Sequence, residues 1–364
     1  MALSYLPLVN RKSTAPVVHR INPLEDPRWD GFLKRHPRSS VFHTSAWLES
    51  LRRTYGCQPV AFSTSSSGED LQNALVACRV DSWLTGQRLV SVPFSDHCDP
   101  LFDSAADFAA VVTALEHELR KQNLRYFELR PMHSLEPVTS LFQQSHTYWH
   151  HQVDLSPDLS TLFHNCHKSS TQRKIKRAER EGLTCHEGRS EALLDDFYRL
   201  LLLTRRRHQL PPQPRTWFQN LLDRMGEALT IRVASKDGRP AAAVLTLQYK
   251  DVLVFKYGAS DARLHPLGGT QFLFWHCIED AKRRGLRFFD LGRTDYSAEG
   301  LARFKDRWGS IRSTLVYTRF ATSPHFGFRA DSDGWKESTA KRLVAQLPDW
   351  AFCSLGSLFY RHAG

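Results

Sequence analysis

The sequence predicts an α/β fold with two similar domains in tandem, because short strand-like segments recur in the same order. Leu-Arg-Tyr-Phe-Glu-Leu-Arg at residues 124–130 returns as Leu-Arg-Phe-Phe-Asp-Leu at residues 286–291. Upstream, Leu-Val at residues 89–90 returns at residues 253–254 with nearly the same spacing. Two such matches around a helical stretch indicate an internal repeat. A chain of 364 residues also suits two domains of roughly 150 residues each.

The predicted division is a first domain at residues 1–156, a second at residues 157–325 and a C-terminal helical extension at residues 326–364. Each domain is expected to contain a mixed, mostly antiparallel sheet flanked by helices. The extension combines aromatic and basic residues, so a contact with a membrane surface is one role for it. Packing against the body of the second domain is the favoured role.

The elements follow from apolar periodicity and from turn residues. No regular element is predicted before residue 43. In the first domain the expected helices are at residues 43–51 and 105–121, and the expected strands at 58–63, 73–80, 88–93, 124–130 and 147–155. In the second domain the expected helices are at residues 168–182, 190–208, 214–227 and 270–284, and the expected strands at 229–235, 240–249, 252–259 and 288–292.

Composition limits the class of protein. The 41% hydrophobic content supports full cores, yet no apolar run approaches the roughly 20 residues of a membrane-spanning helix. Basic residues follow the short apolar stretch at the N-terminus instead of preceding it, which does not fit a secretory signal. The seven cysteines are scattered and never spaced as CxxC. We therefore expect a cytoplasmic protein with reduced cysteines, no metal site and no tightly bound cofactor.

The formal net charge of +11 favours an anionic partner. An anionic small molecule, a nucleotide-linked substrate, an RNA such as tRNA and an anionic membrane surface all fit this charge, and the oligomeric state is left open. The segment 168–182 is the most basic, and only Ile175 and Ala178 in its central part are apolar. Arg173 and Lys176 are its candidate ligand contacts. A solvated helix face supported by Arg–Glu pairs is the open alternative.

A glycine turn, Pro-Leu-Gly-Gly, directly precedes the expected helix at residues 270–284. Unpaired backbone N–H groups and the helix dipole both favour an anion at such a helix N-terminus. Gly268 and Gly269 are therefore the candidate contacts to a phosphate-bearing donor.

The strand meander, glycine turn, long helix and following strand of the second domain resemble the GNAT acyltransferase fold. More particularly, residues 40–320 resemble the FemAB-like family of tandem GNAT transferases. The motifs that carry this resemblance are the basic segment at 168–182, Phe-Asp-Leu-Gly at 289–292, Gly-Leu at 300–301, Phe-Lys at 304–305 and Trp-Gly at 308–309.

The resemblance implies transfer of an acyl or aminoacyl group to an amine, which could belong to a cell-wall or polysaccharide precursor. Pro266 stands where the acetyl-CoA loop of ordinary GNAT enzymes has its first glycine, and proline offers no N–H to a pyrophosphate. The donor is therefore either an acyl-CoA or an aminoacyl-tRNA. The alternative is a non-catalytic protein that binds RNA or an anionic precursor on the same fold.

Attack of an amine on an ester or thioester needs a proton acceptor and stabilisation of the oxyanion. Asp290 ends a predicted buried strand and must be paired or functional, and Arg293 is its expected partner. An ion pair that fixes the turn is favoured over proton abstraction. Tyr296 could donate a proton to the leaving group. A further helix is predicted around Phe304, Lys305 and Trp308, with Phe304 and Trp308 buried and Lys305 projecting toward the cleft. By resemblance to the family, Lys305 stabilises negative charge in the reaction or contacts the donor.

Four more residues are predicted to contact substrate. Asp99 and Asp103 could bind the acceptor amine, and Asp103 could instead cap the helix that begins near residue 105. Tyr257, in the strand before the glycine turn, and Phe304, beside Lys305, complete this set. His97 lies beside Cys98, but no motif in the chain supports a nucleophile there.

Overall fold

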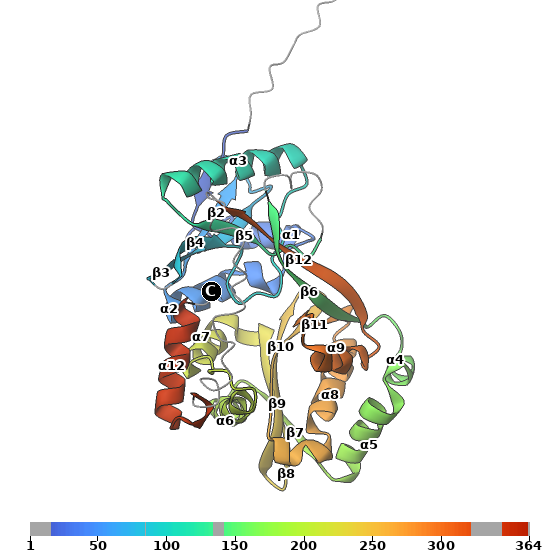
Figure 1. The fold of residues 1–364 in the computed structure, drawn as a ribbon. Helices are drawn as coiled ribbons and strands as arrows, with labels where there is room; N and C mark the ends of the chain where they lie inside the picture. The colour runs from blue at the N-terminus through green and yellow to red at the C-terminus, as the bar shows by residue number, and fades with distance from the viewer. Residues whose placement is uncertain (1–15, 84, 134–141, 322–343, 363–364) are drawn as a thin grey trace, which may run out of the picture.

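A computed structural model of the protein describes residues 16–83, 85–133, 142–321 and 344–362 (Figure 1). In this part of the chain twelve strands form one sheet, in the order β1-β2-β3-β4-β5-β12-β6-β11-β10-β9-β8-β7. The strands are β1 His19–Ile21, β2 Gln58–Ser63, β3 Leu75–Ser82, β4 Gly86–Val90, β5 Tyr126–Leu129, β6 Gln143–Asp154, β7 Thr184–Gly188, β8 Leu229–Lys236, β9 Arg239–Tyr249, β10 Val252–Ser260, β11 Phe288–Asp295 and β12 Ile311–Ala321.

Helices cover this sheet along its whole length (Figure 1). They are α1 Trp29–Arg35, α2 Ser45–Tyr55, α3 Ala105–Lys121, α4 Leu159–Asn165, α5 Arg173–Arg180, α6 Glu191–Arg207, α7 Arg215–Met225, α8 Gly269–Arg283, α9 Glu299–Asp306 and α12 Asp349–His362. A π-helical turn, Lys168–Gln172, leads into α5. Most predicted elements are present, but β1 and α1 lie in the stretch before residue 43 where none was predicted, and α4, β7 and β12 were also missed.

The two helices named most clearly by the sequence begin and end for local reasons. The Thr44 side chain accepts a hydrogen bond from the Trp47 N–H at the start of α2, and Gly56, with φ of 73°, ends that helix. Helix α3 begins after Ser104, whose Oγ accepts from the Asp107 N–H. The cap of α3 is therefore Ser104 and not the predicted Asp103, because a serine hydroxyl at the residue before the first turn reaches the free N–H groups directly.

The internal repeat is confirmed at the level of strand register. In the first half, β4 runs parallel to β5 with Val90 opposite Glu128, and α3 connects the two strands. In the second half, β10 runs parallel to β11 with Val254 opposite Asp290, and α8 connects them. The carboxylates of Glu128 and Asp290 thus occupy equivalent positions in two copies of one β-α-β unit.

The two halves exchange their last strands. Strand β6, predicted as the final strand of the first domain, lies between β12 and β11. Strand β12, the last strand of the second half, pairs on its other side with β5 of the first. The result is one continuous sheet, because each half completes the sheet of the other. The bounds 1–156, 157–325 and 326–364 remain a prediction.

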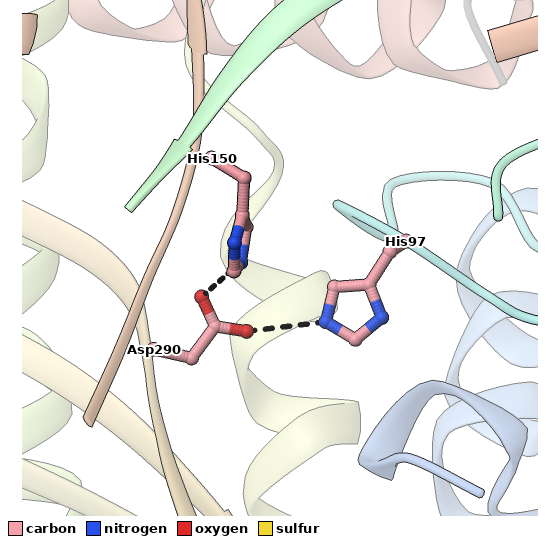
Figure 2. A group of neighbouring side chains, drawn as sticks. All are labelled: His97, His150 and Asp290. Carbon is pink, nitrogen blue, oxygen red and sulfur yellow. Dashed lines mark hydrogen bonds and ion pairs between the residues drawn. The ribbon is translucent and has the colours of Figure 1, made fainter. Parts of the chain in front are cut away.

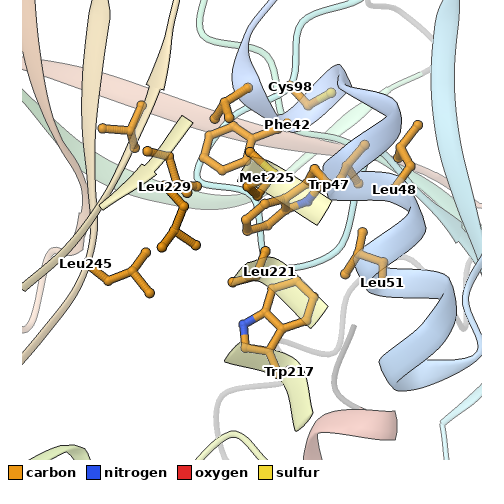
Figure 3. Packing of buried hydrophobic residues seen from close by; sticks show 14 of the residues in the cluster. Phe42, Trp47, Leu48, Leu51, Cys98, Trp217, Leu221, Met225, Leu229 and Leu245 are labelled. Atoms are coloured by element: carbon orange, nitrogen blue, oxygen red, sulfur yellow. The ribbon is translucent and has the colours of Figure 1, made fainter. Parts of the chain in front are cut away.

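The largest hydrophobic core also contains both halves. Helix α2 of the first half packs against α7 of the second, with the rings of Trp47 and Trp217 5.2 Å apart and nearly perpendicular (Figure 3). Faces alternate along β9, since Ala243 lies in this core and Ala242 lies in the core beneath α8. Burial of two tryptophans at one interface favours a fixed relation between the halves.

Helix α12 packs on both halves. Phe352 is buried beneath the guanidinium of Arg206, 4.5 Å from the ring centre, and the His362 carbonyl accepts a 2.9 Å hydrogen bond from Arg88 of β4. A Cβ on Gly356 would lie 2.0 Å from the Pro212 carbonyl oxygen, so this approach requires glycine. The predicted packing of the extension is therefore present from residue 344 onward, while residues 326–343 lie outside the described part. Among the described residues, no helix is long and apolar enough to cross a membrane.

Candidate active site

A pocket of 190 Å³ opens at the N-terminus of α8. Its wall contains Lys174 of α5, Phe304 of α9 and the first residues of α8, Gly269 among them. Gly268 caps α8 without a side-chain hydrogen bond and has φ of 79°, and a Cβ there would lie 2.5 Å from the Lys174 carbonyl oxygen. Backbone N–H groups of the first helical turn, together with a lysine, suit an anionic ligand. Of the two predicted glycines, Gly269 lines the pocket and Gly268 forms the turn.

The pocket wall also includes Ser260, the last residue of β10, which lies beyond the part of β10 that pairs with β11. Strands β10 and β11 pair only over Val252–Val254 and Phe288–Asp290, although both strands continue beyond these residues. A β-bulge in β10 falls between Phe255 and Tyr257, so Lys256 is the extra residue. A second bulge falls in β11 between Asp290 and Gly292. These irregularities aim side chains and backbone groups into the space between the strands.

Asp290 is the centre of a buried polar group at this point (Figure 2). Its Oδ1 lies 2.9 Å from Nε2 of His150 on β6, and its Oδ2 lies 3.1 Å from Nε2 of His97, in the segment between β4 and α3. The Gly292 N–H donates to Oδ1 at 2.7 Å. Burial alone would raise the pKa of Asp290, but the two histidines hold it well below its ordinary value. The expectation that this carboxylate is paired is confirmed.

The predicted partner of Asp290 is wrong. Arg293 instead approaches Asp96, with 3.8 Å between Nε and Oδ1, and donates a 2.8 Å hydrogen bond to the Tyr317 hydroxyl. Strand geometry explains this, because the bulge at Asp290 turns the following residues away from it. Asp96 is held more closely by Lys256, at 2.9 Å. A Cβ at Gly292 would lie 3.1 Å from the Asp96 carboxylate, so the first half fits closely against β11.

Lys305 lies on α9 beside the pocket residue Phe304, but its side chain is buried against β11. Its Nζ donates to the carbonyl oxygens of Gly292 at 2.9 Å and Arg293 at 2.8 Å. Burial lowers its pKa to about 8. The side chain therefore supports the backbone of β11 and does not project into an open cleft, as the sequence suggested. Phe304 packs against Phe274, with ring centres 5.3 Å apart, and Trp308 is buried as expected.

Other predicted residues lie away from this group. Tyr257 is buried in the largest core, where its hydroxyl accepts a 2.8 Å hydrogen bond from Trp217 Nε1. It faces the core, whereas Lys256, the extra residue of the bulge, faces the site. Tyr296 is 43% exposed and stacks on Trp149, with ring centres 4.2 Å apart.

The two predicted acceptor carboxylates also differ from expectation. Asp99 is buried and accepts hydrogen bonds from the backbone N–H of Met132 at 2.8 Å and from His133. It therefore fixes a turn of the first half. The side chain of Asp103 is 81% exposed and lies 3.8 Å from Arg38. No described contact brings either of them to the group around Asp290.

The basic helix is present as α5, which follows a π-helical turn. Arg173 and Lys176 are exposed on it, and Nζ of Lys176 lies 5.6 Å from the ring centre of Phe163. Ile175 and Ala178 are its buried positions, as predicted. The residue of this helix that reaches the pocket is Lys174. Arg173 and Lys176 lie on its solvent side.

Four residues of the buried polar group were not predicted as site residues: Asp96, His97, His150 and Lys256. Asp96 and His97 lie in a strained segment, since Val92 and Phe94 have φ of 46° and 59°. The spacing of Tyr148 and His150 on one strand face was the one sequence signal for a polar face in β6. Lys256 could not be found from the sequence, because a bulge decides where it points.

Comparison with known proteins agrees with this architecture. Residues 167–306 match the acetyltransferase (GNAT) domain family. A UDP-N-acetylmuramoylpentapeptide-lysine N(6)-alanyltransferase from Weissella viridescens is 29% identical over 105 residues, which are 29% of this chain and 31% of that protein. The match thus spans about a third of the relative's length.

Two solved structures share the fold over most of the chain. The crystal structure of FemX gives a TM-score of 0.67 at 13% identity, covering 84% of this chain and 97% of that one. A tandem GNAT protein from the clavulanic acid biosynthesis pathway gives a TM-score of 0.54 at 12% identity, covering 85% and 99%. Residues 167–306 thus match the GNAT domain family, and the chain as a whole shares the fold of FemX and of this tandem GNAT protein.

Proposed function

We propose that the protein is an N-acyltransferase that moves an acyl or aminoacyl group from an activated ester or thioester to an amine. The observation that carries this proposal is the pocket at the α8 N-terminus, whose lining residues all lie within the GNAT-family segment. Free N–H groups and Lys174 suit the phosphates of a donor. The diverging strands leave backbone groups that can orient its reactive end.

The reaction needs no covalent intermediate on the enzyme. A neutral amine attacks the acyl carbon and the bond to the ester oxygen or thioester sulfur breaks. The proton that the amine loses ends on the leaving group, which departs as a free hydroxyl or thiol. In this scheme Phe304 forms the pocket wall and Lys305 keeps the carbonyls of Gly292 and Arg293 in place. Because Lys305 lies 3% exposed behind the strand, it acts on β11 and through β11 on the substrates.

The finer assignment concerns donor and acceptor. The alanyltransferase relative favours an aminoacyl group and an amine of a peptidoglycan precursor. Pro266 in the turn before α8 weakens the case for acyl-CoA. The exposed cations of α5 would then meet the negative charge of a tRNA. A protein that only binds RNA or an anionic precursor is the less favoured alternative.

The test is to incubate the full chain separately with labelled acyl-CoA and labelled aminoacyl-tRNA, each with a panel of nucleotide-linked peptidoglycan precursors and amino sugars. We expect transfer to an amine with one donor class. A Lys174→Ala variant should show weaker donor binding, and Lys282→Ala, on the far end of α8, serves as its control. Tight binding of donor and acceptor with no transfer to any amine would favour the non-catalytic alternative.

A further inference from the structure

Three metal-ligating side chains from distant parts of the sequence converge between the two halves (Figure 2). His97 comes from the segment between β4 and α3, His150 from β6 and Asp290 from β11. One nitrogen or oxygen atom from each lies within 4.8 Å of the others, and all three residues are buried. None of them is explained by packing alone, since each places a polar group in the interior.

The donor atoms suit a divalent transition metal. Two imidazole nitrogens with one carboxylate form a common ligand set for zinc and for non-haem iron. The His150 Nε2 lies 2.9 Å from Oδ1 and the His97 Nε2 lies 3.1 Å from Oδ2, so each histidine faces its own oxygen of the Asp290 carboxylate. Atoms bound about 2.1 Å from one ion lie roughly 3 to 3.5 Å from each other, which is close to these distances. The Gly292 N–H holds Oδ1 of Asp290 at 2.7 Å, which is the kind of outer contact that orients a metal ligand.

The first half has a carboxylate at the position equivalent to Asp290, and positive charge lies beside it. Glu128, the equivalent of Asp290, lies 2.8 Å from Arg130 and 2.7 Å from Arg319. Two guanidinium groups therefore place two permanent positive charges beside the buried carboxylate. In the second half two histidines stand at this carboxylate, and they can either carry positive charge as imidazolium ions or bind a cation as neutral ligands. One dication between them would restore the same balance.

Among the described residues no lysine or arginine forms an ion pair with Asp290, although Lys305 interacts with it electrostatically. Lys256 is paired with Asp96 at 2.9 Å, and Arg293 lies near the same carboxylate and donates to the Tyr317 hydroxyl. Lys305 donates to two backbone carbonyls. Each of these cations has its own acceptors, so the carboxylate of Asp290 is left to the two histidines and the Gly292 N–H.

We propose that His97, His150 and Asp290 bind one divalent transition-metal ion, Zn²⁺ in the first instance, at the junction of the two halves. The ion joins the segment after β4 to strands β6 and β11. It therefore fixes β11 just before Gly292 and Arg293, whose carbonyl oxygens accept hydrogen bonds from Lys305. The site is separate from the α8 pocket and does not depend on the proposed transferase activity.

The full chain without a polyhistidine tag is stripped with a chelator, and metal content is measured by mass spectrometry after reconstitution with Zn²⁺ and dialysis. We expect about one ion per chain, a higher Tm with Zn²⁺ than with chelator, and visible ligand-field absorption after substitution with Co²⁺. His97→Ala and His150→Ala should each bind Zn²⁺ at least about 100-fold more weakly. His117→Ala, an exposed histidine on α3, should bind as the wild type does.

Two results would overturn the proposal. One is a wild-type protein that retains less than about 0.1 ion per chain and shows no Tm change with Zn²⁺. The other is Zn²⁺ binding of equal affinity in wild type and in folded His97→Ala and His150→Ala variants, with circular dichroism as the check on folding. The wild-type measurements decide the matter even if a variant fails to fold, because they need no substitution.

Discussion

The two halves of this protein place a buried carboxylate at the same point of the same β-α-β unit and surround it differently. Glu128 is held by two arginines, whereas Asp290 is held by two histidines. Arginine stays protonated at any physiological pH and donates through a rigid fork, so the first site is a fixed cross-link between β5 and β12. Histidine can lose its proton or bind a metal, so the second site can transfer a proton or hold an ion, which the first site cannot do.

The helix that follows the first strand of each unit shows the same contrast. The Ser104 side chain accepts a hydrogen bond from the first turn of α3. At α8 the cap is Gly268, which offers no side chain, and the pocket opens there. One copy thus uses its helix N-terminus for stability and the other leaves it free for a ligand. The two β-α-β units therefore share a fold but differ in what their helix N-termini can bind.

The largest expected effect comes from removing the carboxylate of Glu128 in the first β-α-β unit. Glu128→Gln leaves Arg130 and Arg319 buried without a carboxylate, and we expect about 3–5 kcal/mol loss of unfolding free energy in urea titrations. The matched control is Glu116→Gln, which breaks an ion pair with Arg120 on the exposed side of α3 and should cost below about 0.5 kcal/mol. Equal effects for the two variants would mean that the carboxylate of Glu128 is not a cross-link.

The next largest effect is expected in the second β-α-β unit, where Lys305 supports β11. Lys305→Ala should fold and lose about a hundredfold in turnover, because the carbonyls that shape β11 lose their donor and the strand no longer holds the substrates in register. Steady-state rates, with the donor and acceptor that the transfer assay identifies, provide the measurement. Arg303→Ala, exposed on the same helix, is the control and should keep its rate. Wild-type turnover in folded Lys305→Ala would remove this residue from the site.

Lys305 should also leave a signature in the pH dependence of stability. Its pKa is lowered from 10.5 to about 8 in the folded protein, mainly by burial. Between these two values the unfolded chain binds more protons, so stability rises with pH, by up to about 3 kcal/mol from this group. We expect the difference in unfolding free energy between wild type and Lys305→Met to be flat below pH 8 and to grow in favour of wild type above it. A difference that stays constant up to pH 10 would contradict the buried position of Nζ.

A smaller effect concerns the basic helix. Arg173→Ala with Lys176→Ala should weaken donor binding about threefold to tenfold at low salt, and less at high salt, because exposed charges are screened. Equilibrium titrations at two salt concentrations measure this. Arg52→Ala with Arg53→Ala on α2 removes the same charge elsewhere and should change little. If affinity and salt dependence both stay unchanged in the first variant, α5 makes no contact with the donor.

The smallest expected effect is on stability and comes from removing the cap of α3. Ser104→Ala should cost about 1 kcal/mol of unfolding free energy, since the first turn of α3 loses its acceptor. Donor binding should not change, because the pocket lies at the other copy of the helix. A fall in donor affinity without a fall in stability would reverse the roles assigned to the two helix N-termini.

Local features of the sequence determined most of the elements. The caps Thr44 and Gly56 placed α2, the apolar spacing of residues 105–121 placed α3, and the repeat of Leu-Val at two positions marked the two parallel pairs. These features act between neighbours in the chain, so they can be read without knowing what lies across the fold. The prediction that Asp290 must be paired succeeded for the same kind of reason, since a carboxylate in an apolar strand is costly wherever it is buried.

Tertiary structure decided who the partners are. The sequence paired Asp290 with nearby Arg293, but the partners come from residues 97 and 150, because strand exchange puts β6 beside β11 and the strained segment after β4 reaches the same point. The bulge at Lys256 directs that side chain toward the site, while Tyr257 stays in the core. Long-range pairing and bulges depend on the whole sheet, and no local pattern of residues encodes them.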